Sequence, residues 1–305
     1  VMTQAPTGVA TYAIPPTFLG IGRSDRAAPI CVAGIPLDLG TTNRSGARFG
    51  PGAIGHASRM LVDGAHPLHW VDPAKLPVAD IGDFAPALGD LVGSLKLIED
   101  AAAGIEHLIA LGGDHTVTLP LLRALKKRRD APGAPALIHF DAHVDTWPDN
   151  FGQAYGHGSV FYHVIEEGLV DPRRMIQIGI RSPVPRDVHD WTAARGVVTL
   201  TAQSVHESGP AAVVERIVEV VGDAPVYLSI DIDVLDPAFA PGTGTPEIGG
   251  LASWQVQAML RQLSGLHFVG MDLVEVAPAY DTAEITALAG ATLAWEYLCL
   301  LGLRR

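Results

Sequence analysis

Short apolar runs alternate with segments of helical period along most of the chain. Several runs, such as ALIHF and VYLSI, are apolar at nearly every position, which is typical of strands buried on both faces of a parallel sheet. We expect strands at 30–35, 76–81, 107–111, 136–140, 175–180, 197–200, 226–232 and 267–274. Apolar residues recur with helical spacing between them, which predicts helices at 91–105, 118–127, 159–167, 211–221, 253–263 and 283–300.

This order of elements predicts an α/β fold with three layers, α/β/α, around a mostly parallel central sheet. Residues 1–28 are rich in Pro, Gly, Ala and Thr, and we expect them to form an irregular N-terminal arm. No linker, repeat or low-complexity tract interrupts the rest of the sequence. We therefore expect residues 29–305 to form a single domain.

Composition and charge narrow the class of function. Of the 305 residues, 48% are apolar, as in a globular protein, and the formal net charge is −12. This charge argues against nucleic acid or an anionic membrane as a partner and favours a small cationic substrate. Cys31 and Cys299 lie in apolar runs, which indicates buried, reduced thiols. With neither a signal-peptide pattern nor an apolar run of membrane-spanning length, we expect a cytoplasmic protein.

Polar residues that stand out follow directly after four of the expected strands. The segments LIALGGDH, LIHFDAHVD, YLSIDID and FVGMDLVE each lead from an apolar run into Asp, His or Glu. In an open α/β sheet, ligands bind beyond the carboxyl ends of the strands, so these segments should converge on one site. Residues two apart on an extended chain also point to the same side. The expected cluster contains His115, Asp141, His143, Asp145, Asp231 and Asp233.

This cluster is expected to bind metal. Single loop carboxylates are usually helix caps, but four of them at the end of a buried sheet would repel one another. One unpaired buried charge already costs on the order of several kcal/mol, and the motifs contain no Lys or Arg. Six ligands, two of which can bridge, suit two divalent cations. Oxygen-rich ligation with one imidazole per ion suits Mn²⁺, and Ni²⁺, Co²⁺ or Zn²⁺ would also fit.

The combined motifs resemble those of the ureohydrolase family of arginases and agmatinases. The resemblance spans roughly residues 30–300, and the matching segments are TTNRSGARFGPGAI, GGDHTVTLP, HFDAHVDTW, GHGSVFY, SIDIDVLDPAFAPGTGTPEIGG and DLVEVAPAYDTAEITALA. The resemblance implies that one manganese is held by His115, Asp141, Asp145 and Asp231, and the other by Asp141, His143, Asp231 and Asp233. It also implies that His157 moves a proton, that Glu275 receives the guanidinium and that Asp145 orients the attacking water.

The implied reaction is hydrolysis of a guanidino C–N bond to urea, or a substituted urea, and an amine. Paired cations would activate the water, and a histidine suits protonation of the leaving nitrogen. Agmatine, giving putrescine and urea, is the substrate we expect. Alternatives are guanidinobutyrate, guanidinopropionate, and an N-substituted guanidine or biguanide such as metformin.

The segment 147–155 should form part of the pocket mouth. Within it, Trp147 and Tyr155 would face the substrate and Asp149 would pair with an ammonium. Gly55, Ser159 and Trp147 depart from the residues common in the family at these positions, and Trp147 raises the prospect of an unusual substrate. We expect His56, His66, His69 and His206, which lack ligand spacing, to be surface or loop residues.

Two other classes of function are less well supported by the sequence. A deacetylase-like amide hydrolase shares the broad fold but would use one zinc and a pair of histidines, whereas this chain has ligands for a second metal and Glu275. A non-catalytic subunit supporting an active paralogue in a mixed oligomer should have lost ligands, and all six are present. The resemblance further implies a homo-oligomer, either a trimer or a hexamer.

Overall fold

Eight parallel strands form the central sheet in the computed structural model, which describes residues 10–128 and 133–304. Their order along the sheet is β2-β1-β3-β8-β7-β4-β5-β6. The strands are β1 (Ile30–Ile35), β2 (Val78–Asp83), β3 (Leu108–Gly112), β4 (Ala136–Phe140), β5 (Met175–Ile180), β6 (Val198–Thr201), β7 (Pro225–Asp231) and β8 (His267–Val274).

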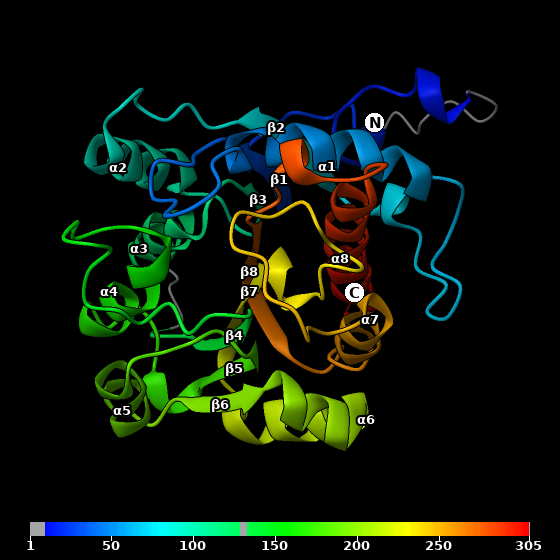
Figure 1. The fold of residues 1–305 in the computed structure, drawn as a ribbon. Helices are drawn as coiled ribbons and strands as arrows, with labels where there is room; N and C mark the ends of the chain where they lie inside the picture. Colours follow the sequence, from blue (N-terminus) through cyan, green and yellow to red (C-terminus); the bar gives the residue numbers. More distant parts are fainter. Residues whose placement is uncertain (1–9, 129–132, 305) are drawn as a thin grey trace.

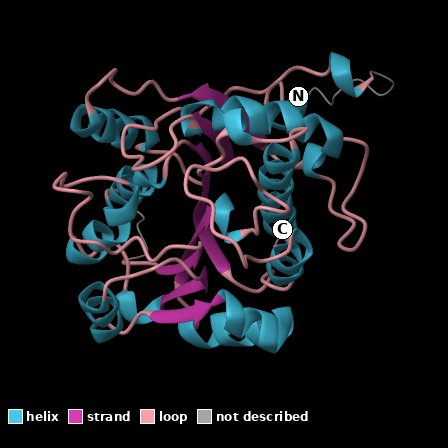
Figure 2. Ribbon diagram, in the orientation of Figure 1, coloured by secondary structure: helices cyan, strands magenta, loops and turns pink. Residues whose placement is uncertain are grey.

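Helices cover both faces of this sheet, as Figure 1 shows. On one face lie α2 (Leu91–Ala102), α3 (Thr118–Lys126), α4 (Val160–Glu166) and α5 (Arg186–Ala194). On the other lie α1 (Gly50–Ser58), α6 (Ala202–Val221), α7 (Ser253–Arg261) and α8 (Ile285–Leu303). Figure 2 shows the sheet as the middle of three layers. The α/β/α fold with a parallel sheet is therefore confirmed.

The apolar residues of the strands form two clusters, one against each helical layer. The inner strands β4, β5 and β7 are buried along almost their whole length, which explains their near-continuous apolar sequence. Helix α8 is long and apolar enough to cross a membrane by length and composition alone, but 67% of its apolar window is buried in the protein, as in a core helix. Cys31 and Cys299 are both buried and free, as expected.

Four strands have the expected bounds, and the other four are shifted by one or two residues at each end. Helices α1 and α5 were not predicted. Helix α1 begins with Gly-Pro-Gly, a poor helix-forming sequence, and packs against α8. Helix α5 buries only Val188 and Thr192, so its apolar period is weak. Helix α6 begins at Ala202 rather than 211, with Gly209 (φ 78°) and Pro210 interrupting it.

The described part of the N-terminal arm packs on α1. Phe18 is buried, its backbone N–H donates to Asp80 Oδ2 (2.7 Å), and the N–H of Leu19 donates to Ser58 Oγ (2.7 Å). A side chain at Gly55 would place Cβ 3.0 Å from the carbonyl oxygen of Pro16. The glycine that replaces a common arginine here therefore allows the arm to lie close to the helix.

His66 lies in a loop, as expected, but it is buried rather than on the surface. Its side chain is fully buried, and Nε2 lies 3.0 Å from Glu296 Oε2 on α8. The same carboxylate accepts hydrogen bonds from Arg261 on α7. This buried group ties the loop that follows α1 to two helices, which explains why an ionisable residue is tolerated there.

Candidate active site

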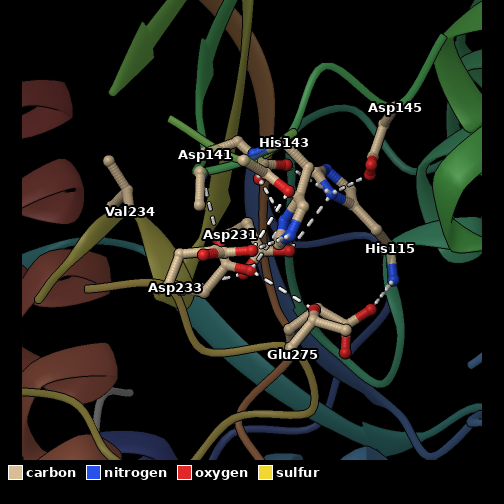
Figure 3. Close-up of polar contacts among 12 residues, drawn as sticks. His115, Asp141, His143, Asp145, Asp231, Asp233, Val234 and Glu275 are labelled. Carbon is tan, nitrogen blue, oxygen red and sulfur yellow. Dashed lines mark hydrogen bonds and ion pairs between the residues drawn. The ribbon is translucent and has the colours of Figure 1, made fainter. Parts of the chain in front are cut away.

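The expected cluster lies at the carboxyl ends of four neighbouring strands in the middle of the sheet: β3, β8, β7 and β4. His115 follows β3, Asp141 follows β4, Asp231 ends β7, and Glu275 follows β8. Figure 3 shows the carboxylates and two imidazoles turned toward one another. Segments separated by as many as 160 residues thus contribute to one site.

His115 is directed at three carboxylates. Its Nδ1 atom lies 3.2 Å from Asp141 Oδ2, 3.1 Å from Asp145 Oδ2 and 3.4 Å from Asp231 Oδ2. Its Nε2 atom lies 2.8 Å from Ser229 Oγ, whose own proton is donated to Asp272. Ser229 must therefore accept from Nε2–H, and the neutral ring presents a bare Nδ1 to the carboxylates.

His143 forms the second centre of the cluster. Its Nδ1 atom lies 3.0 Å from Asp233 Oδ2 and 3.3 Å from Asp141 Oδ1. One carboxylate, that of Asp141, therefore faces both imidazoles. Three of these donors, His143, Asp141 and Asp233, lie within metal-binding reach of one another, and a second such group joins Asp141 to His115 and His139.

The charges in this cluster are unbalanced. Burial, together with the carboxylates of Asp233 and Asp141, raises the pKa of Asp231 well above its ordinary value. Burial alone would lower the pKa of His143, but Asp233 and Asp141 raise it to about 12. Arg181 is close by, but its guanidinium donates to backbone carbonyls, including that of Asp233 at 2.7 Å. The protein thus supplies few positive charges to offset four buried carboxylates.

The donor set fits a pair of divalent cations. His115 Nδ1 is buried and has no hydrogen-bond partner among the described residues, and such orphaned buried atoms need an explanation. A bare ring nitrogen surrounded by carboxylate oxygens has the chemistry of a metal site. Two such centres share Asp141, and all six expected ligands lie around them.

Glu275 and His157 lie beside the cluster and touch each other. Glu275 Oε1 accepts from the backbone N–H of His115 (2.9 Å) and lies 3.0 Å from His157 Nδ1. Oε2 is buried without a hydrogen-bond partner among the described residues. Burial would lower the pKa of His157, but the charge of Glu275 raises it to about 9. The site thus pairs a free carboxylate oxygen with an imidazole that holds its proton at neutral pH.

A cleft of about 390 Å³ opens onto His157 and part of the cluster. Its lining includes His143, Asp145, His157 and Asp231 at the inner end, and Trp147, Asp149, Asn150 and Phe151 farther out. The segment 147–151 therefore forms part of the mouth, as expected. Tyr155 was wrongly placed there, because its ring packs against His163 (4.7 Å between ring centroids) and under Arg123 instead.

Several residues at the site were not assigned a role from the sequence. His139 Nε2 lies 2.7 Å from Asp141 Oδ2, and the two-residue spacing that grouped the expected ligands would have found it. Asp114 and Thr42 lie within the matching segments, but no role was predicted for them. Thr42 Oγ1 lies 2.7 Å from His157 Nε2, and no periodic pattern marks its loop.

Comparison with known proteins agrees with this geometry. The arginase family model matches residues 28–299. A protein of Proteus mirabilis named agmatinase is 47% identical over 275 residues, covering 88% of this chain and 86% of that protein. The crystal structure of a hypothetical agmatinase from Burkholderia thailandensis has a TM-score of 0.90 at 43% identity, covering 97% and 93% of the two chains. The proclavaminate amidino hydrolase of Streptomyces clavuligerus has a TM-score of 0.91 at 38% identity, covering 97% and 100%.

Proposed function

Because this chain belongs to the arginase family and is a ureohydrolase, we propose that it is an agmatinase, which hydrolyses agmatine to putrescine and urea. The observation that carries the proposal is the pairing of the two-centre His/Asp cluster with the free Oε2 atom of Glu275. The first suits activation of water, and the second suits a guanidinium. The agmatinase named among the relatives supports the same choice.

The cleft lining favours a cationic substrate tail. Agmatine carries an ammonium at the end distant from its guanidinium, whereas the guanidino acids carry a carboxylate there. Among the described residues, no Lys or Arg lines the cleft, but Asp149 does. Trp147 and Phe151 add aromatic surface, which also attracts cations. A carboxylate tail would lack a partner and would lie near a like charge, so we expect guanidinobutyrate to be a poor substrate.

We propose that the cations are Mn²⁺, held by the residues that the geometry brings together. One would be bound by His115, Asp141, Asp145 and Asp231, and the other by Asp141, His143, Asp231 and Asp233. Oxygen-rich ligation with one imidazole per ion favours this metal among those available to cells. Ser229 supports the assignment, since it keeps the proton of His115 on Nε2 and leaves Nδ1 free.

The protein's own groups divide the remaining work. When bound, the cations supply an activated water and neutralise the carboxylates. Glu275 Oε2 accepts a guanidinium N–H and presents the guanidino carbon to the cluster. Asp145, which lines the cleft, accepts a hydrogen bond from the attacking water. His157, whose Nδ1 lies next to Glu275, is the imidazolium at neutral pH and donates a proton to the leaving nitrogen.

We also propose that the protein works as a homo-oligomer, a trimer or a hexamer. Its resemblance to the ureohydrolases supports this assembly. Light scattering measures the assembled mass directly, and a particle with the mass of one 32.1 kDa chain would exclude it.

The test is urea release from a panel of guanidines by protein loaded with Mn²⁺ or Ni²⁺. Agmatine should be the best substrate, ahead of arginine, guanidinobutyrate and metformin. The variant Asp149→Asn should lower kcat/KM for agmatine but not for guanidinobutyrate. Asp223→Asn, an exposed aspartate before β7 and far from the cleft, is the matched control and should change neither. A preference for metformin or guanidinobutyrate would contradict the proposed substrate.

A further inference from the structure

The loop between β1 and α1 brings a threonine against the ring of His157. The backbone N–H of Thr42 donates to His157 Nε2 at 3.2 Å, and Thr42 Oγ1 lies 2.7 Å from the same atom. Thr42 lines the cleft and is exposed, whereas His157 is buried. One residue therefore covers the ring nitrogen that does not face Glu275.

Contacts that do not involve the side chain of Thr42 hold this loop in place. The N–H of Gly40 donates to Asp114 Oδ2 at 2.8 Å, and the carbonyl oxygen of Gly40 accepts from the N–H of His157 at 3.1 Å. A Cβ at position 40 would lie 2.1 Å from Thr116 Oγ1, so the backbone approaches too closely for any other residue. We therefore expect the loop and the histidine to remain in register when the hydroxyl of Thr42 is removed.

The two groups of Thr42 act differently on the ring. A backbone N–H can only donate, so it favours an unprotonated Nε2 and places the proton of the neutral ring on Nδ1, toward Glu275 Oε1. A hydroxyl can donate or accept. It therefore bonds to Nε2 in the neutral ring by donating, and to Nε2–H in the imidazolium by accepting. Without the hydroxyl, the Nε2–H group of the imidazolium would face only the backbone N–H of Thr42, which cannot accept a hydrogen bond.

We propose that Thr42 is a positioning residue for the reaction, whose hydroxyl keeps the ring of His157 bonded and oriented in both of its protonation states. This inference rests on the proposed function of His157 as the group that protonates the leaving nitrogen. Among the described residues, the hydrogen bonds of Thr42 go to His157, so Thr42 acts through the histidine.

Three carboxylates act on the charge of His157: Glu275 in direct contact, and Asp145 and Asp114 at longer range. Replacing Thr42 leaves all three in place. Any change in the titration of His157 between variants is therefore due to the hydroxyl.

The experiment compares Thr42→Val, which keeps the shape and the backbone N–H, with Thr42→Ser, which keeps the hydroxyl. In Thr42→Val, kcat should fall roughly 10-fold with KM unchanged, as expected when a hydrogen bond to a charged group is lost in the transition state. The alkaline limb of the kcat profile should move to lower pH by about one unit, because the imidazolium loses its acceptor. Thr42→Ser should have the kcat and the alkaline limb of the unmodified protein.

Thr41→Val is the matched control, since the hydroxyl of Thr41 is buried without a hydrogen-bond partner among the described residues. It should behave like the unmodified protein. The proposal is overturned if Thr42→Val keeps the normal alkaline limb, if Thr42→Ser is as impaired as Thr42→Val, or if Thr41→Val shows the same shift.

A second measurement does not depend on turnover. Ring NMR of the Zn²⁺-loaded protein, with the His157 signals assigned from a His157→Gln variant, should show a lower His157 pKa in Thr42→Val than in the unmodified protein. If the unmodified protein releases no urea from any guanidine, the proposed function fails. The NMR titration then still decides whether Thr42 acts on the ring, and equal pKa values would overturn the inference.

Discussion

Removing the bound cations should lower the melting temperature by about 8 °C. The cluster exists only in the folded chain, where four segments from β3, β4, β7 and β8 meet, so cations that bind it stabilise the native state alone. At a free cation concentration of about 100 times Kd, each site adds about 2.7 kcal/mol. With 305 residues and about 2.1 cal/mol/K per residue, the unfolding entropy is about 0.6 kcal/mol/K. Two sites then give the expected shift.

The assay is calorimetry of loaded and chelated protein, with metal analysis of each sample. Asp233→Ala removes a carboxylate that faces His143 (3.0 Å) and should roughly halve the shift on chelation. Asp149→Ala, an aspartate at the rim of the same cleft, is the matched control and should keep the full shift. If fully loaded protein contains one ion or fewer per chain, or if chelation removes the metal without changing the melting temperature, the two-cation reasoning is refuted.

Three further predictions follow from the site and the core. His157→Ala should keep both cations and a near-normal KM while kcat falls ~10²–10⁴-fold. Asp233→Ala, in contrast, should lose metal and activity together. Metal loss in His157→Ala would contradict the proton-transfer role. Because Glu275 raises the pKa of His157 to about 9, the protonated ring persists below that pH, and activity should fall as pH rises through it. In Glu275→Gln the residual activity should decline at a lower pH. If the alkaline limb of the activity profile does not move, the loss of activity is due to the titration of a group other than His157. Glu296→Ala removes the acidic partner of the buried His66 and the half-buried Arg261. It should lower the free energy of unfolding, measured by urea titration, by about 3–5 kcal/mol. The control Glu219→Ala, in an exposed ion pair, should change this free energy by less than about 1 kcal/mol.

Most of the fold was predictable because its signal is local. Strands buried on both faces must be apolar throughout, and β4, β5 and β8 have the expected bounds for that reason. The failures depend on contacts that the sequence does not display. Helix α1 begins with glycine and proline and is stabilised by packing on α8, so its own sequence gives little evidence of a helix.

The burial of His66 has a similar origin. It depends on Glu296, 230 residues later, and nothing near His66 in the sequence indicates this partner. Tyr155 lies within the mouth segment, but Arg123 and His163 hold its ring away from the cleft. Side-chain direction in an irregular loop is set by such neighbours rather than by position in the sequence.

The six residues of the cluster lie together in the structure, but not entirely for the reason that their spacing suggested. Two-residue spacing aligns side chains on an extended chain, yet β4 ends at Phe140, before the first of its cluster residues, and Asp145 has φ 50°. Asp231 ends β7 and accepts the N–H of Asp233 at 2.8 Å, so these two converge through a tight turn. Glu275 also has a positive φ, 66°. Non-glycine residues adopt this conformation at a cost of about 1–3 kcal/mol each, and such strain is typical of functional sites. The backbone therefore leaves its extended path where carboxylates must be aimed inward, which is why sequence alternation identifies the participants but not the turns that bring them together.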